Sequence, residues 1–202
     1  MSKEAIIKKV TEESSRIKEA ILRDRNILNI IDKVSLEIIE AFKKDKKVLF
    51  CGNGGSAADA QHLAAELSGK FYLDRDPLCA EALHVNSSYL TAVANDFSYD
   101  EVFRRLVKGT GREGDVLVGI STSGNSKNVI SALVLAKDLK MITVGLTGEN
   151  GGMMKDVCDY LIKVPSNNTP RIQESHILIG HVICEIVEEE LFGKEGFLVK
   201  NV

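Results

Sequence analysis

The stretch KVLFCGNGGSAADAQHLAAELSGKF, residues 47–71, joins a short apolar run, a glycine-rich turn and an alanine-rich segment. Residues 47–51 are typical of a buried strand, and residues 57–71 are typical of a helix. The three glycines within residues 52–55 permit backbone conformations that other residues avoid, and they let main-chain N–H groups approach a ligand closely. The stretch therefore predicts a strand, a loop and a helix, which is the repeating unit of α/β folds.

The alternation of strands and helices continues along the chain. It favours a parallel sheet, because the crossover between parallel strands is usually a helix. We expect an α/β fold with a doubly wound, about five-stranded parallel sheet and helices on both faces. The other predicted strands are residues 80–84, 115–120, 141–146 and 160–164, and the other predicted helices are residues 89–95, 101–108, 129–139 and 172–192.

The N-terminal segment, residues 1–42, carries apolar residues at three- and four-residue spacings from Ile6 to Phe42. This spacing predicts a helix, and we expect it to be broken near residues 24–29. Its apolar stripe either packs on its own subunit or forms an oligomer contact. The short tail after Phe192 is expected either to border an interface or to fray.

Composition limits the classes of partner and the compartment. The 202 residues carry a formal net charge of −3, and no Lys/Arg-rich run occurs. Nucleic acids and anionic membranes bind concentrated basic surfaces, so neither is expected as a partner. The chain shows no signal-peptide pattern and no apolar stretch of membrane-spanning length, and its four cysteines are dispersed without a CxxC pair. We therefore expect a cytoplasmic protein whose cysteines are free thiols of the core.

A second polar loop, SerThrSerGlyAsnSer at residues 121–126, follows the predicted strand 115–120. Like Ser56 in the first loop, its hydroxyls precede a helix, and helix N-termini favour anions. Two such loops at the carboxyl edge of one sheet are suited to a phosphate, although either alone is also typical of a plain turn. The chain lacks the Gly-Lys-Ser/Thr of a P-loop and an acidic residue placed for a dinucleotide's ribose, so a sugar phosphate fits better than a nucleotide.

His62 and Glu66 are the first candidates for chemistry. They are four residues apart in the predicted helix 57–71, so they lie on one face of it. An imidazole and a carboxylate so placed bind a divalent metal, or the carboxylate acts as a base. An isolated pair of this kind is more often a solvated polar face, but the adjacent glycine loop favours a functional role.

Gln173, His176 and His181 interrupt the apolar pattern of the predicted closing helix. Gln173 and His181 are eight residues apart, about 12 Å along a helix that rises about 1.5 Å per residue. If both serve one site, they come from different subunits or the helix bends. His176 and His84 are expected to be structural.

Five segments carry a family resemblance: CGNGGSAADAQHLAAEL (51–67), AVANDF (92–97), GREGDVLVGISTSGNSKNV (111–129), TGENGG (147–152) and RIQESHILIGHVICEIVE (171–188). In this order and spacing they resemble the phosphoheptose isomerases of the sugar isomerase (SIS) domain family. The resemblance covers residues 30–192 and implies a flavodoxin-like fold, a single SIS domain over residues 1–202, and a homotetramer with sites at subunit interfaces. We assign residues 1–42 to the oligomer contacts.

The resemblance implies conversion of sedoheptulose 7-phosphate to D-glycero-D-manno-heptose 7-phosphate, the first step toward activated heptoses for bacterial surface polysaccharides such as lipopolysaccharide. It places one Zn²⁺ per subunit at His62, Glu66, Gln173 and His181. The sequence departs from the family pattern at Ala57 and Ala58, where many members have His-Cys. This departure bears on the substrate preference. The implied substrate-binding residues are Asn53, Gly54, Gly55, Ser56, Glu66, Asn95, Asp96, Ser121, Thr122, Ser123, Ser126 and Gln173.

The implied chemistry agrees with these residue types. Isomerisation through an enediol needs a base at the reacting carbons, a group that stabilises the oxygens and a grip on the phosphate. We expect Glu66 to carry the proton between the carbons and His181 to serve ring opening or oxygen protonation, with zinc as a Lewis acid. The competing hypothesis is a non-catalytic SIS adaptor resembling the DnaA initiator-associating protein. The presence of both Glu66 and His181 favours the enzyme.

Overall fold

The computed structural model describes residues 1–193, and the remaining residues, which make up nearly all of the tail after Phe192, lie outside the described part. Each predicted strand and helix is present within a few residues of its expected bounds, whereas the short 3-10 helices η1 and η2 were not predicted. In chain order the elements are α1 (Lys3–Arg23), α2 (Arg25–Lys43), β1 (Val48–Gly52), α3 (Gly55–Ser68), β2 (Ala80–Ala82), α4 (Ser87–Asp96), η1 (Tyr99–Glu101), α5 (Val102–Thr110), β3 (Val116–Ile120), α6 (Lys127–Asp138), β4 (Ile142–Thr147), η2 (Gly152–Asp156), β5 (Tyr160–Lys163) and α7 (Thr169–Phe192).

The five strands form one sheet in the order β2-β1-β3-β4-β5, and every neighbouring pair is parallel, which confirms the predicted topology. From β1 the chain passes to β2 on one side and then returns to place β3 on the other side. In doubly wound sheets, ligands bind beyond the carboxyl ends of the strands, at the point where the strand order reverses. The loops after β1 and β3 therefore flank the expected binding crevice.

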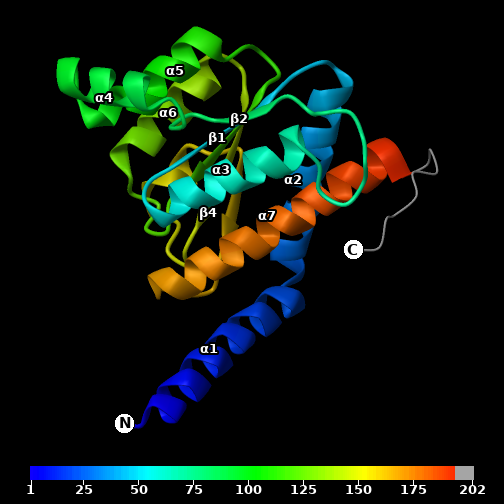
Figure 1. Ribbon diagram of the computed structural model, residues 1–202, viewed down its shortest axis with the longest axis vertical. Coiled ribbons are helices and arrows are strands. Elements are labelled where there is room, and N and C mark those ends of the chain that lie inside the picture. The colour runs from blue at the N-terminus through cyan, green and yellow to red at the C-terminus, as the bar shows by residue number, and fades with distance from the viewer. Residues whose placement is uncertain (194–202) are drawn as a thin grey trace.

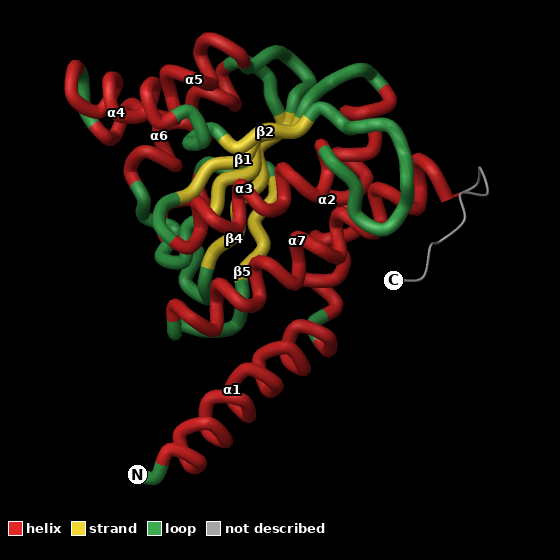
Figure 2. Tube along the Cα trace, in the orientation of Figure 1, coloured by secondary structure: helices red, strands yellow, loops and turns green. Residues whose placement is uncertain are grey.

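Helices cover both faces of the sheet (Figure 1 and Figure 2). Val48 and Phe50 of β1 point into a core shared with α2, α3 and α7, whereas Leu49 and Cys51 point into a second core shared with α5 and α6. Strands that are buried on both faces are expected to be apolar without interruption. This explains the continuous apolar run that begins the stretch 47–71.

The N-terminal helix α1 extends away from the sheet as an arm (Figure 1). The predicted break lies at Asp24, whose carboxylate accepts hydrogen bonds from the N–H groups of Asn26 and Ile27 and so caps α2. Along α1 the structure buries Ile17 and Ile21, while the large apolar side chains toward its N-terminus stay exposed. Within one chain, most of the apolar stripe of the arm is therefore left uncovered.

Helices α3 and α7 lie side by side (Figure 1). Their close approach depends on Gly180, because a Cβ at this position would lie 2.4 Å from Leu63 Cδ2. This packing places the polar residues of the two helices within reach of each other.

The structure also bears on the predictions for membrane-spanning segments and for the cysteines. In the described part of the chain, no helix is both long enough and apolar enough to cross a membrane. Cys51 and Cys184 are buried thiols, as expected, but Cys79 is exposed because it lies just before the edge strand β2. The assignment of all four cysteines to the core was therefore wrong for Cys79.

Candidate functional site

The two glycine and serine loops start side by side at one edge of the sheet. Gly52, the last residue of β1, pairs with Ile120, the last residue of β3. We call residues 53–56 and 121–126 together the two-loop cradle. The loops lead into α3 and α6, and neither helix has a side-chain hydrogen bond at its N-cap. The backbone N–H groups and the positive dipole ends of these helices favour an anion.

A pair of amides ties the two loops together. Asn53 Nδ2 donates to Asn128 Oδ1, and Asn128 Nδ2 donates to Asn53 Oδ1, each at 2.9 Å. The Tyr99 hydroxyl donates to the same oxygen of Asn53 at 3.1 Å. Asn128 is buried, so its amide fixes the orientation of the Asn53 side chain from the protein interior. Asn53 is an expected substrate-binding residue. Asn128 and Tyr99 were not predicted, because no local pattern marks a side chain that supports a different loop.

The second loop gathers its hydroxyls around Ser121. Ser121 Oγ lies 2.9 Å from Ser126 Oγ and 3.5 Å from Ser123 Oγ. Next to this group lies a pocket of about 280 Å³, whose lining contains no charged side chain. An anion bound here would be held by neutral donors. The polar side chains of the pocket are Thr122, Ser123, Asn125, Asn150, Asn167 and Thr169, of which the last four were not predicted.

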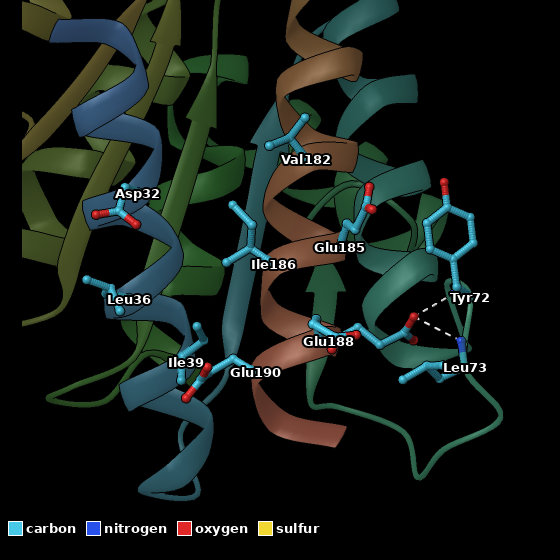
Figure 3. Close-up of a pocket in the computed structure, with 11 residues that line it drawn as sticks. Asp32, Leu36, Ile39, Tyr72, Leu73, Val182, Glu185, Ile186, Glu188 and Glu190 are labelled. Atoms are coloured by element: carbon cyan, nitrogen blue, oxygen red, sulfur yellow. Dashed lines mark hydrogen bonds between the residues drawn. The ribbon is translucent and has the colours of Figure 1, made fainter. Parts of the chain in front are cut away.

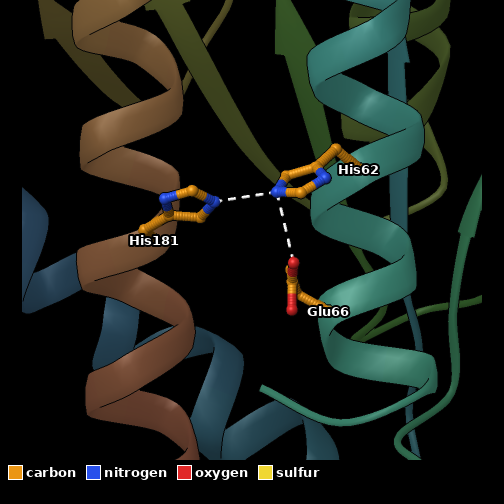
Figure 4. A group of neighbouring side chains, drawn as sticks. All are labelled: His62, Glu66 and His181. Carbon is orange, nitrogen blue, oxygen red and sulfur yellow. Dashed lines mark hydrogen bonds and ion pairs between the residues drawn. The ribbon is translucent and has the colours of Figure 1, made fainter. Parts of the chain in front are cut away.

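A second group of polar residues lies between α3 and α7 (Figure 4). His62 Nε2 lies 2.8 Å from His181 Nε2 and 3.2 Å from Glu66 Oε1. One ligand atom from each residue lies within 4.8 Å of the others. We call these three residues the α3–α7 cluster. The expected stacking of His62 and Glu66 on one helix face is confirmed, and α7 adds His181 to them.

The donor set of the α3–α7 cluster fits a divalent metal. The Nε2 atom of an imidazole carries either one proton or one lone pair. The Nε2 atom of His62 therefore cannot form a full hydrogen bond with both His181 and Glu66. A cation between them would have two imidazoles and one carboxylate as ligands, which are donors that zinc prefers. Three protein ligands with an open position are typical of catalytic zinc sites. The residues present therefore fit the zinc ion that the resemblance implies.

Gln173, the fourth expected zinc ligand, lies at the other end of α3 in the described chain. A Cβ at Gly55 would lie 2.5 Å from Gln173 Nε2, so the amide rests against the first residue of α3. His181 faces His62, two turns further along α3. Since α7 is continuous over Thr169–Phe192, one chain places Gln173 at the two-loop cradle and His181 in the α3–α7 cluster.

Asn95 and Asp96 are the last two residues of α4, and both are exposed. Asn95 Nδ2 donates to Asp96 Oδ1 at 2.9 Å. Among residues 1–193, no hydrogen bond joins either of them to the two-loop cradle. Their expected contact with a sugar therefore stays a prediction.

His176 is a buried supporting residue, and His84 and Asp59 are partly buried groups with shifted pKa values. His176 Nε2 donates to the carbonyl of Thr147 at 3.1 Å, and burial lowers the pKa of His176 to about 4, which confirms its structural role. Burial also lowers the pKa of His84. Asp59, one turn before His62, was not predicted. Burial raises the pKa of Asp59 to about 6, and the charge of His62 opposes part of that rise.

A larger pocket, of about 910 Å³, lies between α2, α7 and residues 72–73, and its lining includes no residue of the two-loop cradle or the α3–α7 cluster (Figure 3). Carboxylates repel a phosphate, so this pocket is a poor place for a sugar phosphate despite its size. Its acidic lining residues are Asp32, Glu185, Glu188, Glu189 and Glu190.

Known proteins resemble this chain over nearly its whole length. Residues 7–148 match the family model described as the SIS domain. Phosphoheptose isomerase 2 of Campylobacter jejuni subsp. jejuni is 54% identical over 189 residues, which cover 94% of each chain. The chain belongs to the phosphoheptose isomerases of the SIS domain family. The phosphoheptose isomerase of Aneurinibacillus thermoaerophilus is 51% identical over 194 residues, covering 96% of this chain and 98% of that protein.

Solved structures of phosphoheptose isomerases have the same fold. That of Neisseria gonorrhoeae superimposes with a TM-score of 0.87 at 40% identity, covering 93% of this chain and 100% of that chain. That of Francisella tularensis has a TM-score of 0.90 at 34% identity, with coverage of 94% and 100%. The predicted family and fold are confirmed, and an isomerase is favoured over the SIS adaptor.

Proposed function

We propose that the protein converts sedoheptulose 7-phosphate to D-glycero-D-manno-heptose 7-phosphate by aldose–ketose isomerisation. Its membership of the phosphoheptose isomerases supports this activity. The structural observation that carries the proposal is the α3–α7 cluster, in which a carboxylate and an imidazole from two helices converge. A protein that acts only as an adaptor requires neither group.

In this proposal the two-loop cradle holds the phosphate. The backbone of residues 53–56 and the hydroxyls of residues 121–126 donate hydrogen bonds to its oxygens. Neutral donors recognise a phosphate through the directions of their hydrogen bonds, whereas positively charged side chains attract any anion. The Gln173 amide at Gly55 is placed to bind the substrate at the same end of α3, and Asn95 and Asp96 bind hydroxyls of the sugar.

The α3–α7 cluster carries out the proton transfers. Glu66 removes a proton from C1 of the ketose and returns it to C2 of the enediol, which yields the aldose. His181 serves ring opening, or it protonates the C2 oxygen as the enediol forms and takes the proton of the C1 hydroxyl as the aldose forms. General acid–base groups of this kind accelerate a step by roughly 10²–10⁴-fold each.

Zinc, one ion per subunit, is proposed as the metal at His62, Glu66 and His181, with Gln173 as the fourth ligand. When bound, the ion supplies Lewis-acid stabilisation of the charge that develops on the sugar oxygens. In its own chain, Gln173 rests against Gly55, at the end of α3 away from the α3–α7 cluster. We therefore propose that the Gln173 at each metal site comes from a neighbouring subunit.

The length of α3 also supports sites shared between subunits. From Gly55 to Glu66 the helix rises about 16 Å, at about 1.5 Å per residue. An extended seven-carbon sugar phosphate spans roughly 10 Å, with carbon–carbon bonds of about 1.5 Å. We therefore propose a homotetramer in which a sugar bridges groups from different subunits, with residues 1–42 in the contacts. Light scattering that showed a fully active monomer would contradict this arrangement.

We further propose that residues 1–202 act as a single domain in the cytoplasm, at the first step toward activated heptoses for lipopolysaccharide or another surface polysaccharide. Dispersed free cysteines, which are typical of a reducing compartment, support the location.

Incubation with sedoheptulose 7-phosphate in D₂O tests the proposed function. The expected result is formation of the aldose with deuterium at C2 in part of the product, because the proton held by Glu66 exchanges with solvent before some of the transfers to C2. A protein that forms no aldose and incorporates no deuterium would instead support the adaptor.

A further inference from the structure

We propose that the buried ion pair of Arg75 and Glu188, here named the Arg75–Glu188 clamp, is the positioning element of the α3–α7 cluster. The clamp joins the end of α3 to α7 and sets the place of Glu66 and His181 relative to each other. This inference rests on the proposed function, since it concerns the same reaction centre. Both side chains are almost fully buried, so neither touches the substrate.

Glu188 lies on α7, two turns beyond His181, and therefore on nearly the same face of the helix. Its carboxylate accepts hydrogen bonds from the backbone N–H groups of Phe71, Tyr72 and Leu73 at 3.1, 2.6 and 2.9 Å. Figure 3 shows this carboxylate extended from α7 to the loop. A fourth donor, Arg75 Nε, lies at 3.0 Å. One side chain of α7 thus binds four residues of the segment that follows α3.

Arg75 closes the connection on the side of α3. Its guanidinium donates to the carbonyl oxygens of Glu66, Leu67 and Gly69 at 3.0, 2.8 and 3.1 Å. Carbonyls in the last turn of a helix have no partner within the helix, so Arg75 satisfies the end of α3 while it also pairs with Glu188. The backbone of Glu66 itself is therefore connected to α7 through two consecutive hydrogen-bonded contacts.

The clamp reaches His181 by a second route. Phe71, whose N–H binds Glu188, places its ring against the imidazole of His181, with the ring centroids 5.6 Å apart. The ring of His62 contacts the same imidazole, with the centroids 5.1 Å apart. The Glu188 carboxylate thus also positions the residue whose ring contacts His181.

Apolar contacts between two helices depend less on direction than hydrogen bonds to a buried carboxylate do. Buried ion pairs are poor sources of net stability compared with apolar packing, and their best-attested benefit is to specify one arrangement. Here four donors meet one carboxylate, and charge-assisted hydrogen bonds of this kind depend strongly on direction. The clamp therefore fits a role in positioning better than a role in stability alone.

The test compares Glu188→Gln with Asp115→Asn. Asp115 is a matched control, because it is also a buried carboxylate that accepts two backbone N–H groups and pairs with a cation, Lys47, directly ahead of β3 and β1. Both variants are expected to unfold at lower urea concentration. We expect Glu188→Gln alone to lower kcat, by about 10–100-fold, with KM changed less than threefold, and to weaken binding of zinc ions in calorimetric titration.

Equal losses of kcat in the two variants, or an unchanged affinity for zinc in Glu188→Gln, would overturn the proposal. If Glu188→Gln does not fold, Arg75→Lys provides the second test, because it keeps the positive charge beside Glu188 and removes the guanidinium that donates to the carbonyl oxygens at the end of α3. A lowered kcat and a shifted ring-proton resonance of His181 support the proposal, and wild-type values of both contradict it. If the wild-type protein does not isomerise the heptose phosphate, the proposed function fails, while zinc affinity and the His181 resonance still decide the positioning role.

Discussion

The two-loop cradle and the α3–α7 cluster differ in how their polar groups are satisfied. In the cradle, Asn53 and Asn128 satisfy each other, and the hydroxyls of Ser121 and Ser126 lie within hydrogen-bonding distance. In the cluster, His62 Nε2 faces both His181 and Glu66 and can satisfy only one of them. The cradle is therefore complete as a binding surface, whereas the cluster needs a proton or a cation to complete it.

We propose that this difference separates binding from chemistry. Groups that are fully hydrogen-bonded in advance present fixed donors at little entropic cost, which suits recognition of a phosphate. Side chains that compete for one proton, as in the α3–α7 cluster, are suited to gaining and losing protons during a reaction. Variants of the cradle are thus expected to change mainly KM, and variants of the cluster mainly kcat.

The largest effect is expected for Glu66→Gln. The amide cannot accept a proton from carbon, so kcat should fall by roughly 10²–10⁴-fold while KM changes much less. Steady-state kinetics with sedoheptulose 7-phosphate measure both values. Glu81→Gln, at an exposed carboxylate on β2, is the control. Near wild-type turnover in Glu66→Gln would remove Glu66 from the role of base.

Removal of metal is expected to have the next largest effect. Stripping zinc with a chelator takes away stabilisation of the charged oxygens, so kcat should fall about 100-fold and return when one zinc ion per subunit is added back. The metal content of the same samples is measured by mass spectrometry. Full activity in metal-free protein would show that the cluster works with protons alone.

In the cradle, Ser121→Ala tests the anchoring of the phosphate. A lost hydrogen bond to a charged group costs about 1.5–3 kcal/mol, so kcat/KM should fall by roughly tenfold to 100-fold, mainly through KM. Ser35→Ala is the control, since Ser35 is a buried serine whose hydroxyl donates to the carbonyl of Ile31 in its own helix. A fall confined to kcat would break the proposed division between the two regions.

His176 lies on α7 between the two regions and predicts a pH dependence of stability. Burial lowers the pKa of His176 from 6.5 to about 4. Between these values the unfolded chain binds a proton that the folded chain does not, so the free energy of unfolding falls as the pH drops from 6.5 to 4. The loss reaches about 3 kcal/mol, and it should disappear in His176→Gln.

Urea unfolding of both proteins at pH 7 and pH 5 measures this dependence. The raised pKa of Asp59 acts in the opposite direction, and the comparison of the two proteins cancels it. Parallel pH profiles of wild type and His176→Gln would contradict the buried neutral imidazole.

The smallest effect is expected for Tyr99→Phe. The hydroxyl of Tyr99 is one of three side-chain contacts of Asn53, and the two to Asn128 remain. Losing one neutral hydrogen bond costs about 0.5–1 kcal/mol, so KM should rise by roughly twofold to fivefold. Asn128→Ala, which removes the other two contacts, should raise KM more. A larger effect of Tyr99→Phe would mean that its hydroxyl binds substrate directly.

The sheet and its loops could be predicted because their signals are local. The apolar run before Gly52 and the hydroxyls of residues 121–126 each show in a few consecutive residues. The supporting contacts could not be predicted in this way. Arg75 and Glu188 are 113 residues apart, and Asn53 and Asn128 are 75 apart, so only the folded chain brings them together. The position of Gln173, the expected fourth metal ligand, would depend further on contacts between subunits in the proposed tetramer.

A crystal structure of Glu66→Gln with sedoheptulose 7-phosphate tests the separation of binding from chemistry most directly. We predict a phosphate held by the two-loop cradle of one subunit, with C1 and C2 of the sugar within contact distance of residue 66 and His181 of one α3–α7 cluster. A heptose whose phosphate lies outside the cradle, or whose C1 and C2 lie away from every α3–α7 cluster of the assembly, would contradict the account.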